Sequence, residues 1–502
     1  MNRRLRFLSA AVLLSLGAAS ARAGMTEARD DYNRDFSRTL TVRPGQRLDI
    51  DHSQGAVRIS THPSPDIQIR AHIEVSTSAS GEAKTFGEGI SVTVEETGEA
   101  IVVRTRYPEK KWHFGGSGFV SYSVDYDIVM PETMPLSARN KFGDISVLNL
   151  KANGTISNAN GKVTFRSGKG EQKIENAFGA IELLGNVGAV DVTGANGTVS
   201  VVDVNGAAQI RNRFGKIEAA RIQGKVTVSG SNGTAAVVDI KGPVSVTNSF
   251  GTVDARNIGG ALDVENGNGA VNADTIKGSA NVRSSFGSVV LTGIAGDATV
   301  NNNNGGITVS NIDGSADLRG SFAKVQASRI KKGVKVVAQN APVSAADVGG
   351  PAYLKTSFGA AEAERVGGDF TVENSNGAVK GSAIKGSANV RTNFGSVWLD
   401  DIGGRIDVDN SNGSIEVRTA PAGTCAPISL ETSFGGIVVR LPESAGYTVD
   451  AKTSFGKIRS DLPLTVAGSI SSESLSGRLG TGQCPLTLAN SNGGIELLKS
   501  AK

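Results

Sequence analysis

Residues 211–252 read RNRFGKIEAARIQGKVTVSGSNGTAAVVDIKGPVSVTNSFGT, and this stretch contains the repeat that decides the fold. Phe-Gly occurs at Phe214 and Phe250, and Asn-Gly occurs midway between them at Asn232. Glycine recurs every nine residues, with apolar residues two and four positions later and mostly polar residues between them. This alternation predicts half-buried strands, and Gly and Asn-Gly supply the positive φ angles that tight turns need.

The pattern extends over more than half of the chain. From Gly143 to Gly413, 27 of the 31 positions spaced nine apart are glycine, and the exceptions are Ala152, Ala323, Lys332 and Ala341. Phenylalanines recur every 36 residues, and asparagines follow the same period offset by 18; Phe322, Asn304 and Asn340 continue these two series. We assign the following as structural turn residues: Phe142, Phe178, Phe214, Phe250, Phe286, Phe358, Phe394, Asn160, Asn196, Asn232, Asn268, Asn376 and Asn412.

Turns of an Ile-x-Gly type alternate with turns of a Ser-(Phe/Asn)-Gly type. Two strands and two turns therefore make 18 residues, and the chain is predicted to be all-β, a parallel β-solenoid with about 18 residues per coil. A 36-residue coil is the alternative, but its lumen would be too wide for Val and Ala to fill. A three-sided coil, built from three of the repeat units, would mix the two kinds of turn. No coil buries its apolar face alone, so neighbouring coils and end caps are required.

The two ends depart from the nine-residue period. Residues 1–23 have the features of a signal peptide: Arg3, Arg4 and Arg6, a short apolar core, and Ala21-Arg22-Ala23 before a mature start at Gly24. Residues 24–141 are predicted to form a β-rich N-terminal capping region, and residues 142–420 the regular solenoid. Residues 421–502 are expected to form irregular coils and a cap that closes at Asn492-Gly493.

Composition restricts the partners. The net charge of +4 comes from the four arginines of residues 1–23, and the rest of the chain is balanced. No stretch dense in Lys and Arg provides the basic footprint of nucleic-acid binding. No segment of the mature chain is long and apolar enough to span a membrane. We therefore expect an exported protein, periplasmic or secreted, in a compartment where disulfides persist.

Cys425 and Cys484 are the two cysteines of the chain, and a disulfide between them would pin the C-terminal cap. Two separate thiols are the alternative. If the cysteines lie three coils apart, about 14 Å at ~4.8 Å per coil, they are beyond the reach of a bridge unless their loops lean together.

The chain lacks the sequence motifs of nucleotide-binding sites, zinc proteases and serine hydrolases. The four histidines, His52, His62, His72 and His113, are not spaced as metal ligands, and no metal or cofactor is expected. Asp203, Asp239 and Asp347 share one column of the coil, but Arg221 and Asn257 interrupt it. We therefore predict no catalytic residues; a polysaccharide hydrolase or lyase is the alternative, and it would need clustered acids.

Two large aromatics are expected at outward strand positions, Tyr353 and Trp398, where they could bind sugars or partner proteins. On an 18-residue coil they lie on opposite faces, which argues against one shared platform. The glycine period also fails three times in succession between residues 323 and 341, which indicates a local bulge, a ligand site or neutral drift.

With these Phe-Gly and Asn-Gly units and a signal peptide, the chain resembles the bacterial DUF4097 "putative adhesin" family, and Val124–Pro131 resembles the strand that precedes the repeats in that family. The resemblance implies a parallel β-solenoid of the cell envelope without catalytic residues. Our leading hypothesis is a non-catalytic, adhesin-like envelope protein that binds a polymer or protein partner. An envelope-stress or assembly scaffold is a third hypothesis.

Overall fold

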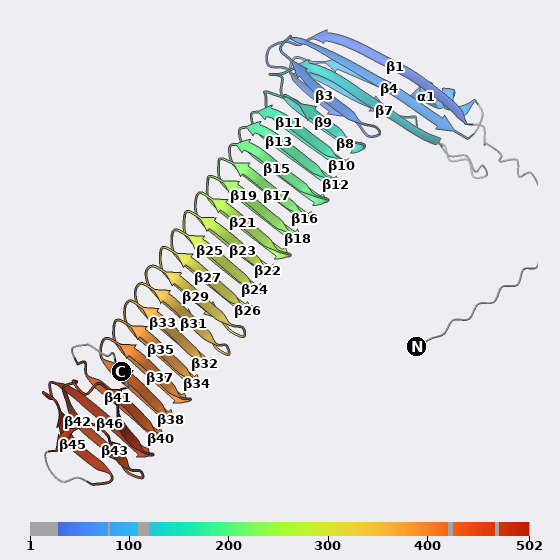
Figure 1. Ribbon diagram of the computed structural model, residues 1–502. Helices are drawn as coiled ribbons and strands as arrows, with labels where there is room; N and C mark the ends of the chain where they lie inside the picture. Colours follow the sequence, from blue (N-terminus) through green and yellow to red (C-terminus); the bar gives the residue numbers. More distant parts are fainter. Residues whose placement is uncertain (1–28, 79–80, 109–119, 420–424, 467–470, 501–502) are drawn as a thin grey trace, which may run out of the picture.

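The computed structural model describes residues 29–78, 81–108, 120–419, 425–466 and 471–500. The predicted signal peptide and His113 lie outside these residues. The described chain is almost entirely β-strand and forms a long, straight parallel β-solenoid with an antiparallel extension at its N-terminal end (Figure 1). The prediction of a parallel β-solenoid is confirmed.

Each regular coil contributes one strand to each of two parallel sheets, which we call sheet A and sheet B. The strands of sheet B, from the first regular coil onward, are β8 (Leu136–Phe142), β10 (Gly154–Asn160), β12 (Gln172–Phe178), β14 (Val190–Asn196), β16 (Ala208–Phe214), β18 (Val226–Asn232), β20 (Val244–Phe250), β22 (Leu262–Asn268), β24 (Ala280–Phe286), β26 (Ala298–Asn304), β28 (Ala316–Gly320), β30 (Val334–Val337), β32 (Ala352–Phe358), β34 (Phe370–Asn376), β36 (Ala388–Phe394), β38 (Ile406–Asn412) and β40 (Ile428–Phe434).

Sheet A faces sheet B across the interior and receives the intervening strands. They are β9 (Ile145–Leu148), β11 (Val163–Lys169), β13 (Ile181–Val187), β15 (Val199–Asn205), β17 (Ile217–Ile222), β19 (Ala235–Ile240), β21 (Val253–Ile258), β23 (Val271–Ile276), β25 (Val289–Ile294), β27 (Ile307–Ile312), β29 (Val325–Ile330), β31 (Val343–Val348), β33 (Ala361–Val366), β35 (Val379–Ile384), β37 (Val397–Ile402), β39 (Ile415–Thr419) and β41 (Ile437–Leu441).

The register of the two sheets fixes the length of the coil. In sheet B, Val226 of β18 pairs with Val244 of β20, and in sheet A, Ile217 of β17 pairs with Ala235 of β19. Phe214 pairs with Asn232, so Phe does not stack directly on Phe. The 18-residue prediction is confirmed and the 36-residue alternative is excluded.

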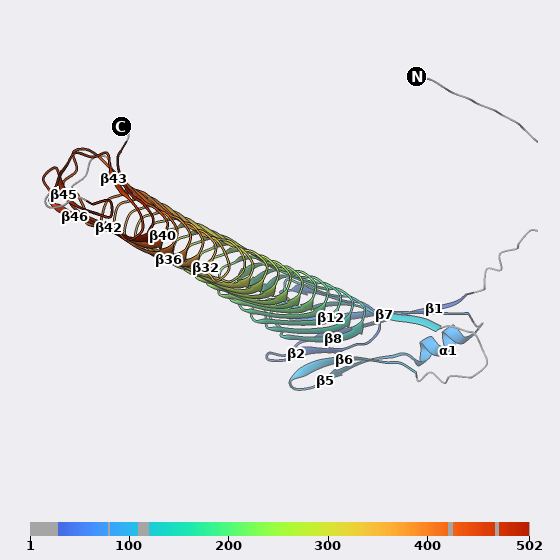
Figure 2. The ribbon, with the colours of Figure 1, turned by 90° about the horizontal axis from the view of Figure 1, so that it is seen from below.

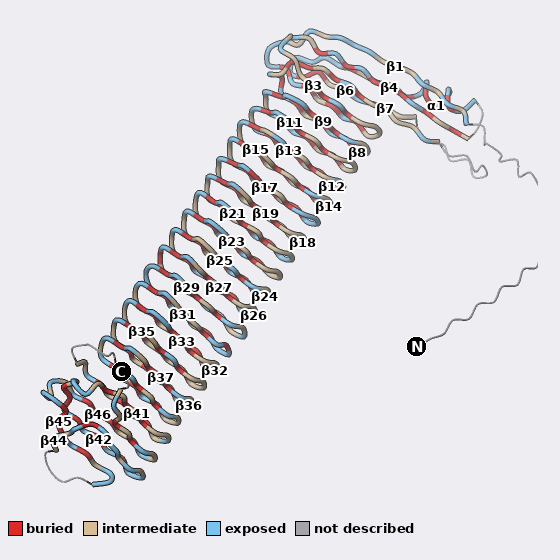
Figure 3. The backbone as a smooth tube through the Cα atoms, in the orientation of Figure 1, coloured by how far each residue is buried: buried red, intermediate tan, exposed pale blue. Residues whose placement is uncertain are grey.

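The core is a thin double layer of Val, Ile, Leu and Ala from the inner faces of both sheets (Figure 3). Aromatic rings enter it rarely within the regular coils. Phe370 is one such ring, and it lies over Gly381, where a Cβ atom would come within 2.8 Å of the ring. The two sheets can pack this closely because nearly all inward side chains are small.

Many of the turns that follow sheet-B strands contain a buried asparagine two residues before the last residue of the strand. In other coils this position is taken by Gly194, Gly230, Ser284, Thr356, Thr392 or Thr432. Asn248 Nδ2 donates to the carbonyl oxygen of Gly233 in the preceding coil at 3.2 Å, and Asn266 repeats the contact with Gly251 at 3.1 Å. These amides satisfy carbonyls that the ladder of the sheet leaves free. The sequence analysis did not identify this asparagine ladder, although its N-x-(Phe/Asn)-Gly signature is visible in the sequence.

The N-terminal region extends both sheets rather than standing apart from them. Its elements are β1 (Asp30–Thr41), β2 (Arg47–Asp51), β3 (Val57–His62), β4 (Asp66–Thr77), α1 (Glu82–Gly89), β5 (Ser91–Glu96), β6 (Ala100–Arg106) and β7 (Val120–Pro131). β3 pairs with β9 in sheet A and β2 with β8 in sheet B, both in parallel. β1, β4 and β7 then form a long antiparallel ribbon beyond the first coil (Figures 1 and 2).

The C-terminal region closes in an order that the sequence analysis did not predict. It comprises β42 (Tyr447–Thr453), β43 (Ile458–Ser460), β44 (Leu464–Val466), β45 (Ser474–Leu479), β46 (Cys484–Asn492) and β47 (Ile495–Lys499). β46 pairs with β40 on one side and with β42 on the other, and β47 likewise lies between β41 and β43. The coil ending in Asn492-Gly493 is therefore an inner coil, and the antiparallel strands β42, β45 and β44 form the outer end.

This insertion determines the distance between the two cysteines. Cys425 and Cys484 lie in neighbouring coils, not three coils apart, with Cα atoms 5.8 Å apart, and they form a disulfide bond. The larger separation considered from the sequence was wrong because it assumed that the coils stack in chain order.

Candidate functional site

One long edge of the solenoid, which we call the Phe/Asn edge, is the column of Phe and Asn residues that end the sheet-B strands from Phe142 to Phe434; β28 and β30 interrupt it, because they end at Gly320 and Val337. Phe and Asn alternate along it in register, as in the series Phe142, Asn160 and Phe178. The phenylalanine rings point to solvent, and each residue is about half exposed. The column continues into the cap with Phe455, which is 76% exposed. The predicted turn residues therefore have a second effect, which is to place a row of apolar rings on the surface.

The residues beside some of these rings are small, whereas Arg213 and Lys216 flank Phe214. Ser249 precedes Phe250 and Thr252 follows its glycine, and Ser285 and Ser288 flank Phe286 in the same way. The regularity is lost where the glycine period fails, because β28 and β30 are short and no pairing between them extends past Arg319 and Val337.

The opposite edge, which we call the Asp/Arg edge, is the column of residues that recur every 18 positions from Asn149 to Asp401, near the ends of the sheet-A strands. Every non-glycine residue of this column has a φ angle between 52° and 61°, including Arg221 and Ala383. Here the structure corrects the sequence analysis, since the glycines of the Ile-x-Gly turns, such as Gly224, do not supply the positive φ. They allow close contact between coils, because a Cβ on Gly224 would lie 2.4 Å from the oxygen of Gly206.

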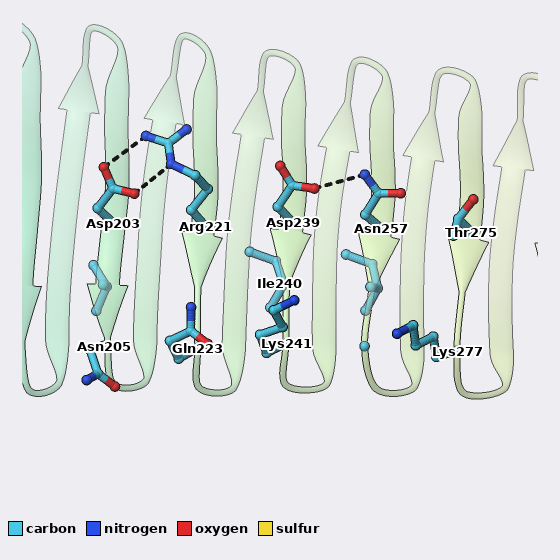
Figure 4. A pocket seen from close by; sticks show the side chains of 13 residues that line it. Asp203, Asn205, Arg221, Gln223, Asp239, Ile240, Lys241, Asn257, Thr275 and Lys277 are labelled. Atoms are coloured by element: carbon cyan, nitrogen blue, oxygen red, sulfur yellow. Dashed lines mark hydrogen bonds and ion pairs between the residues drawn. The ribbon is translucent and has the colours of Figure 1, made fainter.

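Side chains of the Asp/Arg edge pair from coil to coil across a shallow groove of about 850 Å³ (Figure 4). Arg221 donates from Nε and Nη2 to the two carboxylate oxygens of Asp203, at 2.6 and 2.9 Å. Asn257 Nδ2 donates to Asp239 Oδ1 at 2.8 Å. Farther along, Arg365 Nε donates to Asp347 Oδ1 at 2.5 Å.

These pairs bear on the hydrolase alternative. Hydrogen bonds from Arg221 lower the pKa of Asp203, and hydrogen bonds from Arg365 lower the pKa of Asp347. The general acid of a glycosidase needs a raised pKa and a second carboxylate facing it. In this column Asp203, Asp239 and Asp347 are instead each followed by a donor, Arg or Asn, so the arrangement suits coil-to-coil pairing.

The two outward aromatics lie on different sheets. Tyr353 is in β32 of sheet B, where its hydroxyl donates to Glu373 Oε1 at 3.0 Å and Lys335 Nζ lies 5.8 Å from its ring centroid. It lines a groove of about 410 Å³. Trp398 is in β37 of sheet A, between Lys380 and Glu416 of the adjacent strands. The two rings do not form one platform.

The described histidines stay apart. His52 is buried, its Nδ1 lies 3.1 Å from Thr105 Oγ1, and burial lowers its pKa to about 4. His72 is exposed, and its hydrogen bond with Asp35 raises its pKa. In the described part of the chain, no three His, Cys, Asp or Glu side chains gather into a metal-binding group. Over the same residues the longest helix, α1, has eight residues and is too short to cross a membrane.

Comparison with known proteins supports the resemblance noted from the sequence. Residues 262–498 match the model of the Toastrack DUF4097 family. The match begins at Leu262, so it does not include Val124–Pro131. No curated protein matches the chain. A crystal structure of a "putative cell adhesion protein" from Clostridium sporogenes ATCC 15579 aligns over 93% of this chain and 100% of its own length, with 8% identity and a TM-score of 0.15, which is too low to indicate a shared shape.

Proposed function

Starting from a solenoid whose residues 262–498 match the Toastrack DUF4097 family, we propose that this chain is an exported, non-catalytic envelope protein that binds an extended polymer or a protein partner along its length. The observation that carries the proposal is the repetition of one exposed side-chain pattern from Phe142 to Phe434. Many weak, identical contacts on a rigid lattice give a high overall affinity through effective concentration.

The non-catalytic assignment is supported by the chemistry of the Asp/Arg edge. Asp203 and Asp347 accept hydrogen bonds from arginine, which favours their ionised form and opposes a role as proton donors. Asp203 and Asp239 are also two coils apart, with Arg221 between them.

The proposed location is the periplasm or the extracellular space. It is supported by the basic, apolar and small-residue segments of residues 1–23, and the Cys425–Cys484 disulfide fits an oxidising compartment. Cell fractionation with N-terminal sequencing tests this part of the proposal, because export with processing predicts a mature protein that begins at Gly24. Unprocessed protein in the cytoplasm would contradict it.

Binding is tested by mixing the purified chain with a panel of envelope and extracellular polysaccharides and separating the mixtures by size-exclusion chromatography. We expect the protein to co-elute with one class of intact polymer. Polymer that elutes later, as shorter chains, would overturn the non-catalytic assignment. If no polymer shifts the protein and none is shortened, the polymer branch of the proposal is wrong and a protein partner remains.

A further inference from the structure

The Phe/Asn edge combines two properties that ordinary surface residues do not combine. Outside the irregular turn that contains Phe322, its phenylalanines are exposed, between 46% for Phe214 and 56% for Phe358 among the series from Phe142 to Phe394, and they recur with a fixed period. Single exposed apolar residues are common, whereas a row of them marks a contact surface. A ligand for this edge must therefore be long and must repeat with the edge.

The spacing of the rings indicates the repeat length that a ligand of this edge needs. Successive phenylalanines such as Phe214 and Phe250 lie two coils apart, about 9.6 Å at ~4.8 Å per strand, and Asn232 lies midway. We propose that the Phe/Asn edge binds an extended β-1,4-linked polysaccharide with one disaccharide per two coils. This inference rests on the proposed binding function and names its surface and its ligand class.

The alternating faces of the sugars in such a glycan match the alternation of Phe and Asn along the edge. In an extended β-1,4-linked chain each sugar is turned over relative to the last, so the same face recurs once per disaccharide, a distance close to two strand spacings. A phenylalanine ring packs on the C–H face of one sugar, and the asparagine of the next coil meets the hydroxyl groups of the following sugar. Asn196 Nδ2 donates one hydrogen to the oxygen of Ala177 at 3.3 Å, and its other N–H and its carbonyl oxygen have no further partner among the described residues.

A second column of sheet B follows this period in part and indicates a charge on the expected ligand; Glu175, Thr247 and Glu431 interrupt it. The residue three positions before the phenylalanine is basic in most Phe coils, whereas the residue at that position in the intervening Asn coils is never basic. The basic members are Arg139, Arg211, Arg283, Arg319, Lys355 and Arg391.

Arg139, Arg283 and Arg391 lie on the outward face of sheet B, and no ion pair engages them within the described chain. The other three basic members already pair with an acid of this chain, Arg211 with Asp191, Arg319 with Asp317 and Lys355 with Glu373. The unpaired arginines favour a glycan that carries acidic substituents, but they are too far apart to set the period of those substituents.

The shape of the edge favours a polymer over a second copy of this chain. The rings form a single row, and small residues such as Ser285 and Ser288 flank some of them, whereas Arg213 and Lys216 flank Phe214. Protein interfaces instead bury a broad central patch. Self-association through the Phe/Asn edge is therefore a competing outcome, and the experiment must distinguish it from glycan binding.

The test uses the full chain and two probes measured by isothermal titration calorimetry and affinity electrophoresis. Xanthan is a β-1,4-glucan with acidic side chains on alternate glucose units, and cello-oligosaccharides of two to eight sugars are its uncharged counterpart. Dextran, which is α-1,6-linked, is the control polymer. We expect binding of xanthan and no binding of dextran. We also expect oligosaccharide affinity to rise with each added disaccharide, not with each added sugar.

Three variants locate the binding surface. The triple variant F214A/F250A/F286A should lower xanthan affinity at least tenfold, because the loss of each ring should lower the affinity about three- to tenfold. The matched variant L148A/L184A/V290A removes exposed apolar side chains from sheet A and should bind as the wild type does. The variant R283Q/R391Q should weaken xanthan binding and its salt dependence but leave cello-oligosaccharide binding unchanged.

The outcomes separate this inference from the proposed function. Equal losses in the Phe and the Leu/Val variants, or no loss in either, would overturn the assignment to the Phe/Asn edge even if the wild type binds xanthan. Binding of another polymer with no response to the phenylalanine substitutions would leave the proposed function intact and this inference wrong. If none of the glycans binds and sedimentation shows self-association that F214A/F250A/F286A abolishes, the occupant is a second copy, and the glycan assignment is also overturned.

Discussion

Both edges of the solenoid reverse the direction of the chain in every coil, but the residues that form the turns differ in chemistry. At the Phe/Asn edge, glycines such as Gly233 adopt the positive φ, a buried asparagine braces the turn, and apolar rings face the water. At the Asp/Arg edge, non-glycine residues such as Asp239 adopt the positive φ, a buried Ile follows, and polar side chains pair on the surface. The difference teaches that the glycine period has two causes, since the glycines of the Phe/Asn edge need both the positive φ and room, whereas those of the Asp/Arg edge need only room.

The largest effect is expected from Gly233→Ala at the Phe/Asn edge. The backbone has φ of 147° there, and the added Cβ would lie 2.2 Å from the carbonyl oxygen of Gly215. We expect a loss of stability of at least about 3 kcal/mol from strain and displacement of the neighbouring coil. Urea unfolding with hydrogen exchange over β16–β20 measures it. Gly98→Ala is the control, because nothing lies within 4 Å of its new Cβ. Equal effects of both substitutions would contradict this account of the edge.

The asparagine ladder should give the next largest effect. Asn248→Ala removes the donor to the oxygen of Gly233 and leaves that carbonyl without its amide partner. The expected destabilisation is about 2 kcal/mol. The surface substitution Asn257→Ala at the Asp/Arg edge loses one exposed hydrogen bond to Asp239 and should change stability by less than about 0.5 kcal/mol. The comparison of the edges fails if the two alanine variants unfold at the same urea concentration.

Acid should destabilise the N-terminal region more than either edge of the solenoid. No ionisable side chain is fully buried in the described regular coils, whereas His52 is buried in the N-terminal capping region. Its pKa is lowered from 6.5 to about 4 because burial disfavours the imidazolium. The unfolded state therefore binds the proton first, so the stabilisation is present above pH 6.5 and is lost as the pH falls toward 4. About 2 kcal/mol should be lost between pH 7 and pH 5.

Unfolding of the cap, followed by circular dichroism and by hydrogen exchange of β2 and β3, measures this loss. His52→Phe should remove the pH dependence in that interval. His72→Gln, at an exposed residue, is the matched control and should retain it. An unchanged pH profile in His52→Phe would assign the dependence to another group.

The smallest effect is expected at the Asp/Arg edge and has the opposite sign. Ala383 has φ of 52°, a conformation that costs an alanine about 1 kcal/mol or more, and its side chain offers no polar group for pairing. Ala383→Gly should therefore raise stability by about 0.5 kcal/mol after the added flexibility of the unfolded chain is counted. Ala236→Gly, within β19, should lower stability by about 1 kcal/mol, and thermal melting can distinguish the two signs.

The sequence predicts the architecture well because the signals of the repeat are local. Glycine and apolar residues alternate within each repeat unit, and that spacing determines the strands and turns. The alternation of the two kinds of turn then selects an 18-residue coil. The positive φ of Arg221 could not be predicted this way, because arginine has no preference for that conformation and the Asp203 partner lies a full coil away. The pairing of β46 with β40 also depends on contacts between distant parts of the chain.

The candidate site was predicted in part. The phenylalanines were identified as turn residues from their period, but their exposure could not be predicted, because the alternation set by buried Ala208 and Ile210 would place Phe214 on the inner face. The pairing of Arg221 with Asp203 was missed, although the sequence places both residues in one column. Tyr353 and Trp398 were correctly placed on opposite faces, because the parity of the strands determines the sheet.

The insertion of β46 and β47 between earlier coils imposes an order of assembly on this end of the molecule. β46 lies between β40 and β42, although it comes after both of them in the chain and after β43, β44 and β45 as well. β40 and β42 therefore do not become neighbours. An emerging chain can therefore add regular coils one after another as far as β41, but the terminal layer must wait for residues 484–499. A truncation before Cys484 would act as an internal deletion, leaving an unfilled layer and an unpaired Cys425.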